Sequence, residues 1–202
     1  PTPYMRELVA SFSSNATGAV SHTISASTLY QLTPDSRELS IIIEAKTEDE
    51  DGTQIGELYL QEITAYVKNS DPIISSVSYQ TSNLDTLTGN TTTVIVGYSD
   101  IIVTVSATAK NYASIASYHV AVGSKRATVT TNEVGSVTLS IPAVDGDTAN
   151  ITVYDSRGNS SGTTLNLTAL TYNPLVIKSA RAVRQNHVEA ATSLALSGTV
   201  HT

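Results

Sequence analysis

Carboxylates gather at two places in the sequence where they could hold a metal ion. One is the acidic run of residues 48–51, and the other is residues 145–147. Ca²⁺ takes about six to eight hard oxygen ligands, and the candidate ligands here are Asp49, Asp51, Asp145 and Asp147. Neither run has the spacing of a calcium-binding loop with a distal glutamate. We therefore expect solvated turns at both places, with a calcium ion shared at a domain junction as the alternative.

A serine that lies between charged residues, in Asp155-Ser156-Arg157, invites comparison with a catalytic nucleophile. Serine catalysis needs a base within hydrogen-bond reach, and that base must be oriented by a third group. No Gly-x-Ser-x-Gly turn surrounds the serine, and the histidines are far apart in the sequence: His22, His119, His187 and His201. The sequence therefore predicts a hairpin turn with Arg157 exposed, no catalytic residue, and a protein that is not an enzyme.

Sugar binding is a further chemistry that the residue types could support. The aromatic residues are ten tyrosines and one phenylalanine, with no tryptophan. Tyr118 and Tyr154 fall within strand patterns, so we expect both rings to be packed, with the hydroxyl groups at the rim. Tyr112 lies in an expected loop and is the candidate residue for stacking against a glycan.

Composition narrows the classes of partner. The net charge is −7 with no basic cluster, and a nucleic-acid-binding surface needs clustered lysine and arginine. No apolar run is long enough to span a bilayer, so we expect neither nucleic acid nor membrane as a partner. Cysteine is absent, which excludes disulfides, cysteine-bound metals and thiol catalysis. We expect no cofactor beyond the calcium alternative.

The elements that must position these residues are strands. Valine, isoleucine and threonine recur in short runs, and residues 101–107 and 114–122 alternate with the period of two that a half-buried strand requires. The pattern predicts antiparallel strands at 73–79, 92–96, 101–109, 115–122, 126–131, 136–141, 149–155 and 162–170.

A weak internal repeat organises these strands. Residues 41–65 and 151–169 each read as a strand, a turn that contains Gly-x-x-x-Gly, and a return strand. Pro72 and Pro174 then follow in equivalent positions about 100 residues apart, which is the length of one immunoglobulin-like sandwich. The sequence thus predicts an all-β protein of tandem immunoglobulin-like β-sandwiches with antiparallel strands.

Three segments follow from the repeat. Residues 1–70 form a first immunoglobulin-like sandwich that is short at its start, and residues 71–171 form a complete second one. Residues 172–202 hold two strands, too few to bury a core alone. We interpret them as the start of a further β-module or as strands that pair with a partner, and we expect the chain to be part of a longer array.

The order of several segments resembles minor structural proteins of the tail tip in siphophages of streptococci and lactococci. The segments are 94–96, 101–107, 117–120, 137–139, 151–161, 172–180 and 182–186. The acidic run at 48–51 departs from the more neutral turn that the resemblance leads us to expect. The resemblance implies repeated immunoglobulin-like modules, a location in the virion tail, and a role in tail architecture or host attachment.

Three hypotheses of function follow. The first is a structural protein of a phage tail tip or baseplate, whose partners are other tail proteins, copies of itself and the cell-wall polysaccharide of the host. The second is a carbohydrate-binding adhesin module of a bacterial surface or secreted protein, with an extracellular location. The third is a non-catalytic accessory domain of a secreted hydrolase.

Overall fold

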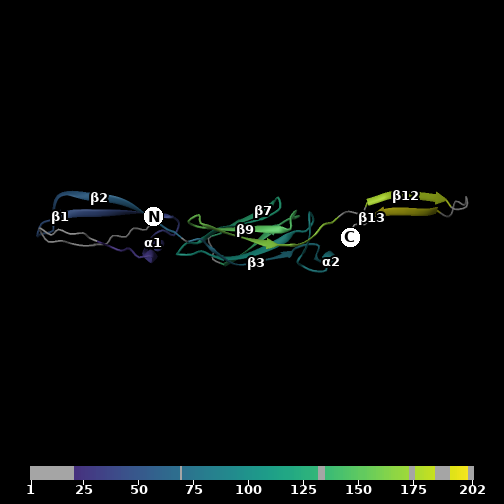
Figure 1. The fold of residues 1–202 in the computed structure, drawn as a ribbon, viewed down its shortest axis with the longest axis horizontal. Coiled ribbons are helices and arrows are strands. Elements are labelled where there is room, and N and C mark those ends of the chain that lie inside the picture. Colours follow the sequence, from purple (N-terminus) through teal and green to yellow (C-terminus); the bar gives the residue numbers. More distant parts are fainter. Residues whose placement is uncertain (1–20, 69, 132–134, 173–175, 185–191, 200–202) are drawn as a thin grey trace.

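The computed structural model describes residues 21–68, 70–131, 135–172, 176–184 and 192–199. Strands dominate it, and the sheets are antiparallel apart from one short parallel pair. Figure 1 shows a central β-sandwich with one two-stranded hairpin extending from each end. The all-β prediction is confirmed. Within the described ranges, no helix is long and apolar enough to cross a membrane.

The central sandwich has two facing sheets. The first has the order β3-β5-β8, with bounds Ile73–Thr81, Ile101–Thr108 and Gly135–Ile141. The second has the order β10-β9-β6-β7, with bounds Ser160–Asn166, Thr148–Asp155, Ile115–Val122 and Lys125–Thr130. The strands agree with those expected from the sequence to within a few residues at each end, with one exception. The single strand expected at 162–170 is divided into β10 and a short strand β11 (Thr168–Leu170) that pairs elsewhere.

Two short elements close the sandwich. Strand β4 (Thr93–Ile95) pairs in parallel with β11 (Thr168–Leu170). The last strand of the sandwich therefore lies beside a strand from its beginning. The one-turn helix α2 (Asp85–Thr88) bridges β3 and β4. Strand β11 is therefore held to the sandwich immediately before the chain leaves it.

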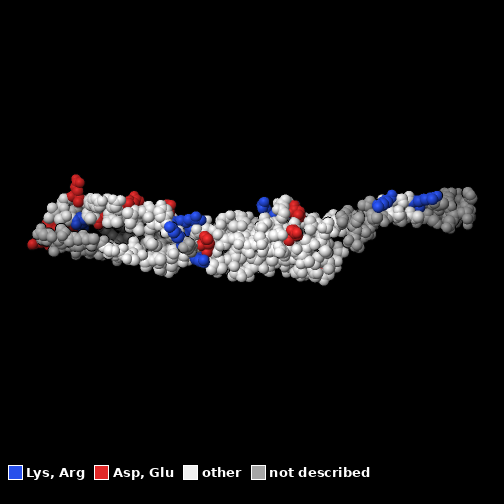
Figure 2. Space-filling view, in the orientation of Figure 1, with Lys and Arg blue, Asp and Glu red and all other residues white. Residues whose placement is uncertain are grey.

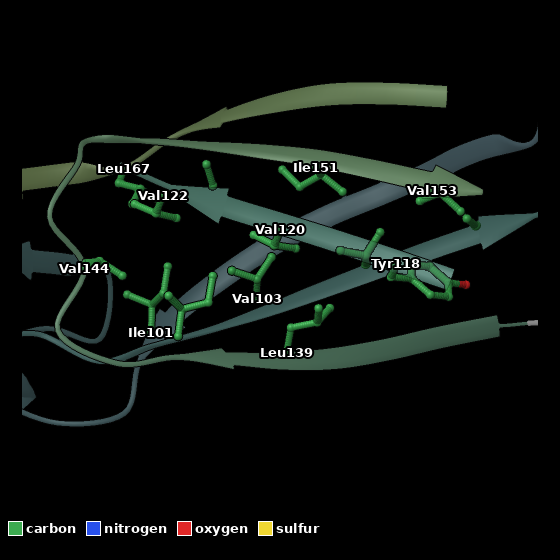
Figure 3. Packing of buried hydrophobic residues seen from close by; sticks show 14 of the residues in the cluster. Ile101, Val103, Tyr118, Val120, Val122, Leu139, Val144, Ile151, Val153 and Leu167 are labelled. Carbon is green, nitrogen blue, oxygen red and sulfur yellow. The ribbon is translucent and has the colours of Figure 1, made fainter. Parts of the chain in front are cut away.

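Alternating side chains on the inner faces form the core (Figure 3). Along β5, buried and half-buried residues alternate, as the period of two in the sequence requires. Tyr118 has no exposed surface, so its expected packing is confirmed, and burial raises the pKa of its hydroxyl group. The largest fully buried side chains are Tyr118, Ile101, Ile115, Leu139, Ile141, Ile151, Val94, Val103, Val105, Val120, Val122 and Val144.

The described part of residues 1–70 holds one helix and one hairpin. Helix α1 (Ala26–Leu32) begins at Ser25, whose hydroxyl oxygen accepts a hydrogen bond from the Thr28 N–H over 3.0 Å. Strands β1 (Glu38–Glu48) and β2 (Gln54–Tyr66) form a long antiparallel pair. These described residues contain one two-stranded sheet rather than two facing sheets, so the tandem arrangement of complete sandwiches is not confirmed.

The C-terminal segment holds a second hairpin. Strands β12 (Val176–Arg184) and β13 (Thr192–Thr199) pair antiparallel, with a register shift between Ile177 and Ser179. The two strands expected at residues 175–183 and 190–200 are thus present. They extend from the end of the sandwich opposite to β1 and β2 (Figure 1).

Candidate functional site

The turn between β9 and β10, residues 155–159, connects the sandwich to the N-terminal hairpin, and we call it the junction turn. Asp155 is 2% exposed, and one of its carboxylate oxygens accepts the N–H groups of Arg157 and Asn159 over 3.0 and 2.8 Å. The other carboxylate oxygen accepts the Asn159 side-chain amide over 2.9 Å. Gly158 supplies the left-handed backbone that closes the turn, at φ +76°.

Arg157 is buried in this turn, which makes the expectation of an exposed side chain wrong. It is 6% exposed, and its guanidinium donates hydrogen bonds to four backbone carbonyl groups. The acceptors are Thr33 O at 2.6 Å, Tyr30 O at 3.1 Å, Lys110 O at 3.2 Å and Asn111 O. Burial lowers the pKa of Arg157, and nearby Asp155 opposes that shift.

The carbonyl groups around Arg157 come from two separate segments. Tyr30 and Thr33 lie at the end of α1, and the Tyr30 ring centroid is 5.8 Å from the guanidinium carbon. Lys110 and Asn111 lie in the loop between β5 and β6, where Asn111 adopts a left-handed backbone. A planar group with five donors can bind both sets at once, so Arg157 fastens α1 to the sandwich.

Neighbouring residues hold the base of the β1–β2 hairpin to the same turn. Arg37, which directly precedes β1, donates to the carbonyl oxygens of Arg157 over 3.1 Å and of Gly158. The Asn159 amide donates to the buried Ser70 hydroxyl over 2.8 Å, just before β3. Both ends of the hairpin are therefore bound to one turn, which fixes the direction in which it leaves the sandwich.

Ser156 serves the same junction and has no catalytic arrangement. Its hydroxyl donates to Pro34 O over 2.6 Å and accepts the Ser114 N–H over 3.1 Å. A serine that does face a histidine is Ser117, whose Oγ lies 3.0 Å from His119 Nε2. The other ring nitrogen contacts the Thr128 hydroxyl at 3.1 Å, in the place where a triad has a carboxylate.

The acidic candidates for a metal site lie in two different turns. Asp49 closes the turn between β1 and β2, where one carboxylate oxygen accepts the N–H groups of Asp51 and Thr53 over 3.0 and 2.8 Å. Asp145 accepts the Ser124 N–H over 2.8 Å and also the Ser124 hydroxyl.

These bonds make both aspartates structural members of turns. The hydroxyl and N–H of Ser124 lower the pKa of the Asp145 carboxyl. Asp147 accepts the Thr148 hydroxyl over 3.1 Å. Among the described residues, no three of histidine, aspartate and glutamate converge as a metal site.

Tyr112 contributes to the junction through its hydroxyl group. That hydroxyl oxygen accepts the Gln31 side-chain amide of α1 over 2.9 Å and lies 3.4 Å from the Ser27 hydroxyl. The hydrogen bonds from Ser27 and Gln31 lower the pKa of Tyr112. Tyr112 remains 58% exposed. Its hydroxyl group therefore has a structural role at the junction, and the prediction that its ring stacks against a glycan stays a prediction.

The outer face of the four-stranded sheet carries a shallow hollow that the sequence did not indicate. It has a volume of about 240 Å³, and a second hollow adjoins it at Asn150 and Thr152. Tyr154 borders this face with 37% exposure, so the expectation that it is packed is wrong. The His119 ring meets it edge to face, at 5.1 Å between centroids. The first hollow is lined by His119, Val120, Ala121, Arg126, Ala127, Thr128, Asn150 and Thr152.

The contacts of Arg157 at the junction turn could not be predicted from the sequence, because the acceptors are backbone carbonyl groups, which any residue type can supply. The available signal was the pattern Asp-x-x-Gly, present at residues 49–52 and again at 155–158. No protein-family model matches the chain, and no curated protein is significantly similar to it.

Proposed function

We propose that this chain is a non-enzymatic structural protein of a phage tail tip or baseplate, with immunoglobulin-like modules that act as directed spacers and contribute to host attachment. The observation that carries the proposal is the junction turn. A spacer must hold consecutive modules in a fixed direction, and buried Arg157 and Asn159 bind both ends of the β1–β2 hairpin to the sandwich. The ordered resemblance of the sequence to siphophage tail proteins supplies the location.

The proposal places the chain in the virion tail, in contact with other tail proteins and with copies of itself. Antibody labelling of purified phage particles that carry the gene for this chain tests it. We expect label at the tail tip in intact particles. Particles that infect normally and contain none of the chain, measured by mass spectrometry, would refute the proposal.

The hollow on the outer sheet face supports a second candidate, a module that binds neutral glycans at a cell surface. Asn150 and Arg126 are among the residues that line the hollow and carry amide and guanidinium donors, and exposed Tyr154 lies on the same strand as Asn150. Such donors next to an aromatic ring suit sugar hydroxyl groups. Its location would be extracellular, or on the virion if the tail protein also carries the receptor-binding surface.

A titration with purified cell-wall polysaccharide distinguishes this candidate. We expect saturable binding that Arg126→Ala and Tyr154→Ala weaken, while Tyr112→Phe leaves it unchanged. Binding that is lost only in a Tyr112 variant would move the glycan site to the junction. No saturable binding at all would eliminate the glycan candidate.

A further inference from the structure

Strand register places the two hollows on the outer face of the four-stranded sheet. Tyr118, Val120 and Val122 of β6 are buried in the core, so the residues between them face outward. Pairing of the strands aligns such outward residues in rows that cross the sheet from β7 through β6 and β9 to β10. The first row is Thr130, Ser117, Tyr154 and Ser160, the second is Thr128, His119, Thr152 and Gly162, and the third is Arg126, Ala121, Asn150 and Thr164.

Each hollow contains one of the two smallest residues in these rows. Ala121 lines the first hollow, of about 240 Å³, and lies between Arg126 and Asn150 in its row. Gly162 lines the second hollow, of about 470 Å³, and lies beside Thr152. A methyl group in one place and a hydrogen atom in the other are surrounded by longer side chains. The hollows therefore arise where the outer face lacks side-chain volume.

The two hollows form one groove. Asn150 and Thr152 line both of them, and these residues lie on β9, the strand between β6 and β10. Ala121 and Gly162 are two strands and one row apart, a separation of about 12 Å for strands about 4.8 Å apart and residues about 3.4 Å apart. This separation exceeds the length of one sugar ring. A ligand that fills both hollows is therefore a chain of several units.

The groove is polar and carries little charge. Threonine hydroxyl groups and the Asn150 amide surround it, Arg126 is the one side chain of the three rows with a permanent charge, and no residue of the rows is acidic. Figure 2 shows that the visible side of the sandwich is largely uncharged, whereas charged residues gather over the β1–β2 end and the junction. Such a surface suits a neutral ligand with many hydroxyl groups.

Aromatic rings border the first hollow. His119 lines it and meets the Tyr154 ring edge to face. The two ring nitrogens of His119 contact the hydroxyl groups of Ser117 and Thr128, at 3.0 and 3.1 Å, so the imidazole is held at the wall. A sugar presents C–H groups on the faces of its ring and hydroxyl groups around its edge. Rings beside hydroxyl, amide and guanidinium groups match both parts.

We propose that the two hollows are adjoining subsites of one site for a linear chain of neutral sugars, which crosses the sheet from β7 to β10. The first hollow is the main subsite, because the His119 ring and the Arg126 guanidinium belong to it. The second hollow takes the next units of the chain. Asn150 and Thr152 contact the chain in both subsites.

The inference rests on the glycan-binding candidate and deepens it, since it specifies a chain rather than a single sugar and assigns its units to two places. The structural role in a tail is independent of it and is tested by labelling of particles. Saturable binding of polysaccharide that ignores the second hollow would support the glycan candidate and refute the two subsites.

Dependence on chain length is the first test. The full chain is titrated, by isothermal calorimetry, with purified neutral cell-wall polysaccharide and with size-fractionated fragments of it, from the monosaccharide upward. We expect the affinity to rise with length until a fragment spans both hollows and then to level off. Equal affinity for the monosaccharide and the longest fragments would overturn the proposal, and so would the absence of saturable binding to any of them.

Filling the second hollow is the second test. A Cβ atom at Gly162 would lie 3.5 Å from Ile151 O, an ordinary contact, and valine is favoured in strands, so Gly162→Val should keep the fold and its melting temperature. We expect it to weaken binding of long fragments by a factor on the order of ten, the equivalent of one or two lost hydrogen bonds. Binding of the shortest fragments should not change.

A matched control for this variant lies on the same strand. Asn166→Val adds the same side chain to the outward face of β10, outside both hollows. We expect it to leave the affinity for every fragment unchanged. Equal weakening by Gly162→Val and Asn166→Val would show that the second hollow is not a subsite.

Filling the first hollow identifies the main subsite. Ala121→Leu places a larger side chain between Arg126 and Asn150, which are both exposed and can move aside. We expect it to weaken binding of short and long fragments alike, and Thr130→Leu, on the same face outside the hollows, to change neither. Loss of short-fragment binding in Gly162→Val but not in Ala121→Leu would contradict the assignment.

Salt dependence tests the class of ligand. A neutral chain should bind almost equally well at low and high salt, because screening acts on charges and Arg126 then serves as a hydrogen-bond donor. Binding that falls steeply as salt rises would show that the groove selects an anionic polymer, which overturns the assignment of neutral sugars.

Discussion

At the scale of single residues, the buried guanidinium of Arg157 is the feature with the most consequences. Its partners lie at the end of α1 and in the loop between β5 and β6, so one side chain connects segments that are distant in the sequence. The sequence located the turn but not this role, because a carbonyl acceptor can belong to any residue type. An arginine in a polar turn is usually exposed, and tertiary contacts overrode that tendency here.

Replacement of Arg157 tests this role. We expect Arg157→Ala to destabilise the junction by about 2–4 kcal/mol, because it leaves buried carbonyl groups without donors. Arg157→Lys should recover only part of the loss, since an ammonium group cannot reach both sets of acceptors. Hydrogen exchange of residues 26–37 measures the effect. Unchanged protection in the alanine variant would show that α1 is held by other contacts.

Asp145 gives a prediction for pH. Its pKa is lowered by hydrogen bonds from Ser124, so the charged form stabilises the folded state. That contribution is present above the ordinary range of an aspartate and is lost as the pH falls through the lowered pKa. We expect the melting temperatures of the wild type and Asp145→Asn to differ at neutral pH and to converge in acid. Ser124→Ala should show a smaller difference of the same sign, and a difference independent of pH would contradict the assignment.

At the scale of elements, the sequence predicted where most strands lie. It did not predict what packs around the β1–β2 hairpin. Alternation of apolar residues marks a strand wherever one of its faces is buried, and the strand pattern predicted β3 and β5–β9 closely, whereas the strand expected at 162–170 is divided into β10 and β11. A similar alternation occurs along β1, with Ile42 as the exception, but not along β2, and no second sheet of the described residues covers this hairpin. Periodicity reports that a face is suited to burial and carries no information on what covers it.

The two related hairpin turns allow a comparison within one chain. Asp155 and Asp49 make the same backbone hydrogen bonds, but Asp155 is buried and also binds the Asn159 side chain. We expect Asp155→Ala to cost about 2–3 kcal/mol and Asp49→Ala about 1 kcal/mol or less. Urea unfolding followed by tyrosine fluorescence measures both. A cost for Asp49→Ala as large as that for Asp155→Ala would mean that the first turn is also buried in solution.

In the β6–β7 turn, the backbone of Gly123 lies very close to the side chain of Asp145, which gives a further prediction. A Cβ atom at Gly123 would lie 2.2 Å from Asp145 Oδ1, and the residue has φ +56°. We expect Gly123→Ala to destabilise the sandwich by about 1–3 kcal/mol, through strain and the loss of the Asp145 contact. Gly89→Ala is the control, since its positive φ is similar and its Cβ would meet open space. The melting temperatures of the two variants distinguish the steric clash with Asp145, which only Gly123→Ala creates, from the cost of placing alanine at positive φ, which both share.

At the scale of the whole molecule, the hairpins extend from opposite ends of the sandwich (Figure 1). The repeat in the sequence indicated the spacing of the modules, and the structure shows one complete sandwich between two hairpins in the described residues. The prediction of a first sandwich, short at its start, in residues 1–70 stays a prediction, because the described part of this segment holds one two-stranded sheet.

The direction of the first hairpin can be measured because the chain has no cysteine to interfere with labelling. Spin labels at Glu50→Cys and Thr128→Cys report the distance between the hairpin tip and the sandwich. We expect a narrow distance distribution, which Arg157→Ala broadens and the exposed-face variant Ile42→Glu does not. A distribution that is already broad without the Arg157 substitution would show that the junction turn does not fix the direction.

The parallel pairing of β4 with β11 determines how the sandwich responds to tension along its length. Strand β11 leads out toward β12, and β4 is anchored in the sandwich after β3 and α2. A pull on the C-terminal side of the chain loads β11 along its own direction, so its hydrogen bonds with β4 share the load instead of breaking one after another. Leu170 O, which accepts the Val96 N–H over 3.0 Å, lies at the end of this patch. This end of the sandwich therefore resists shear along β11 more strongly than a pair of strands that is peeled apart one bond at a time.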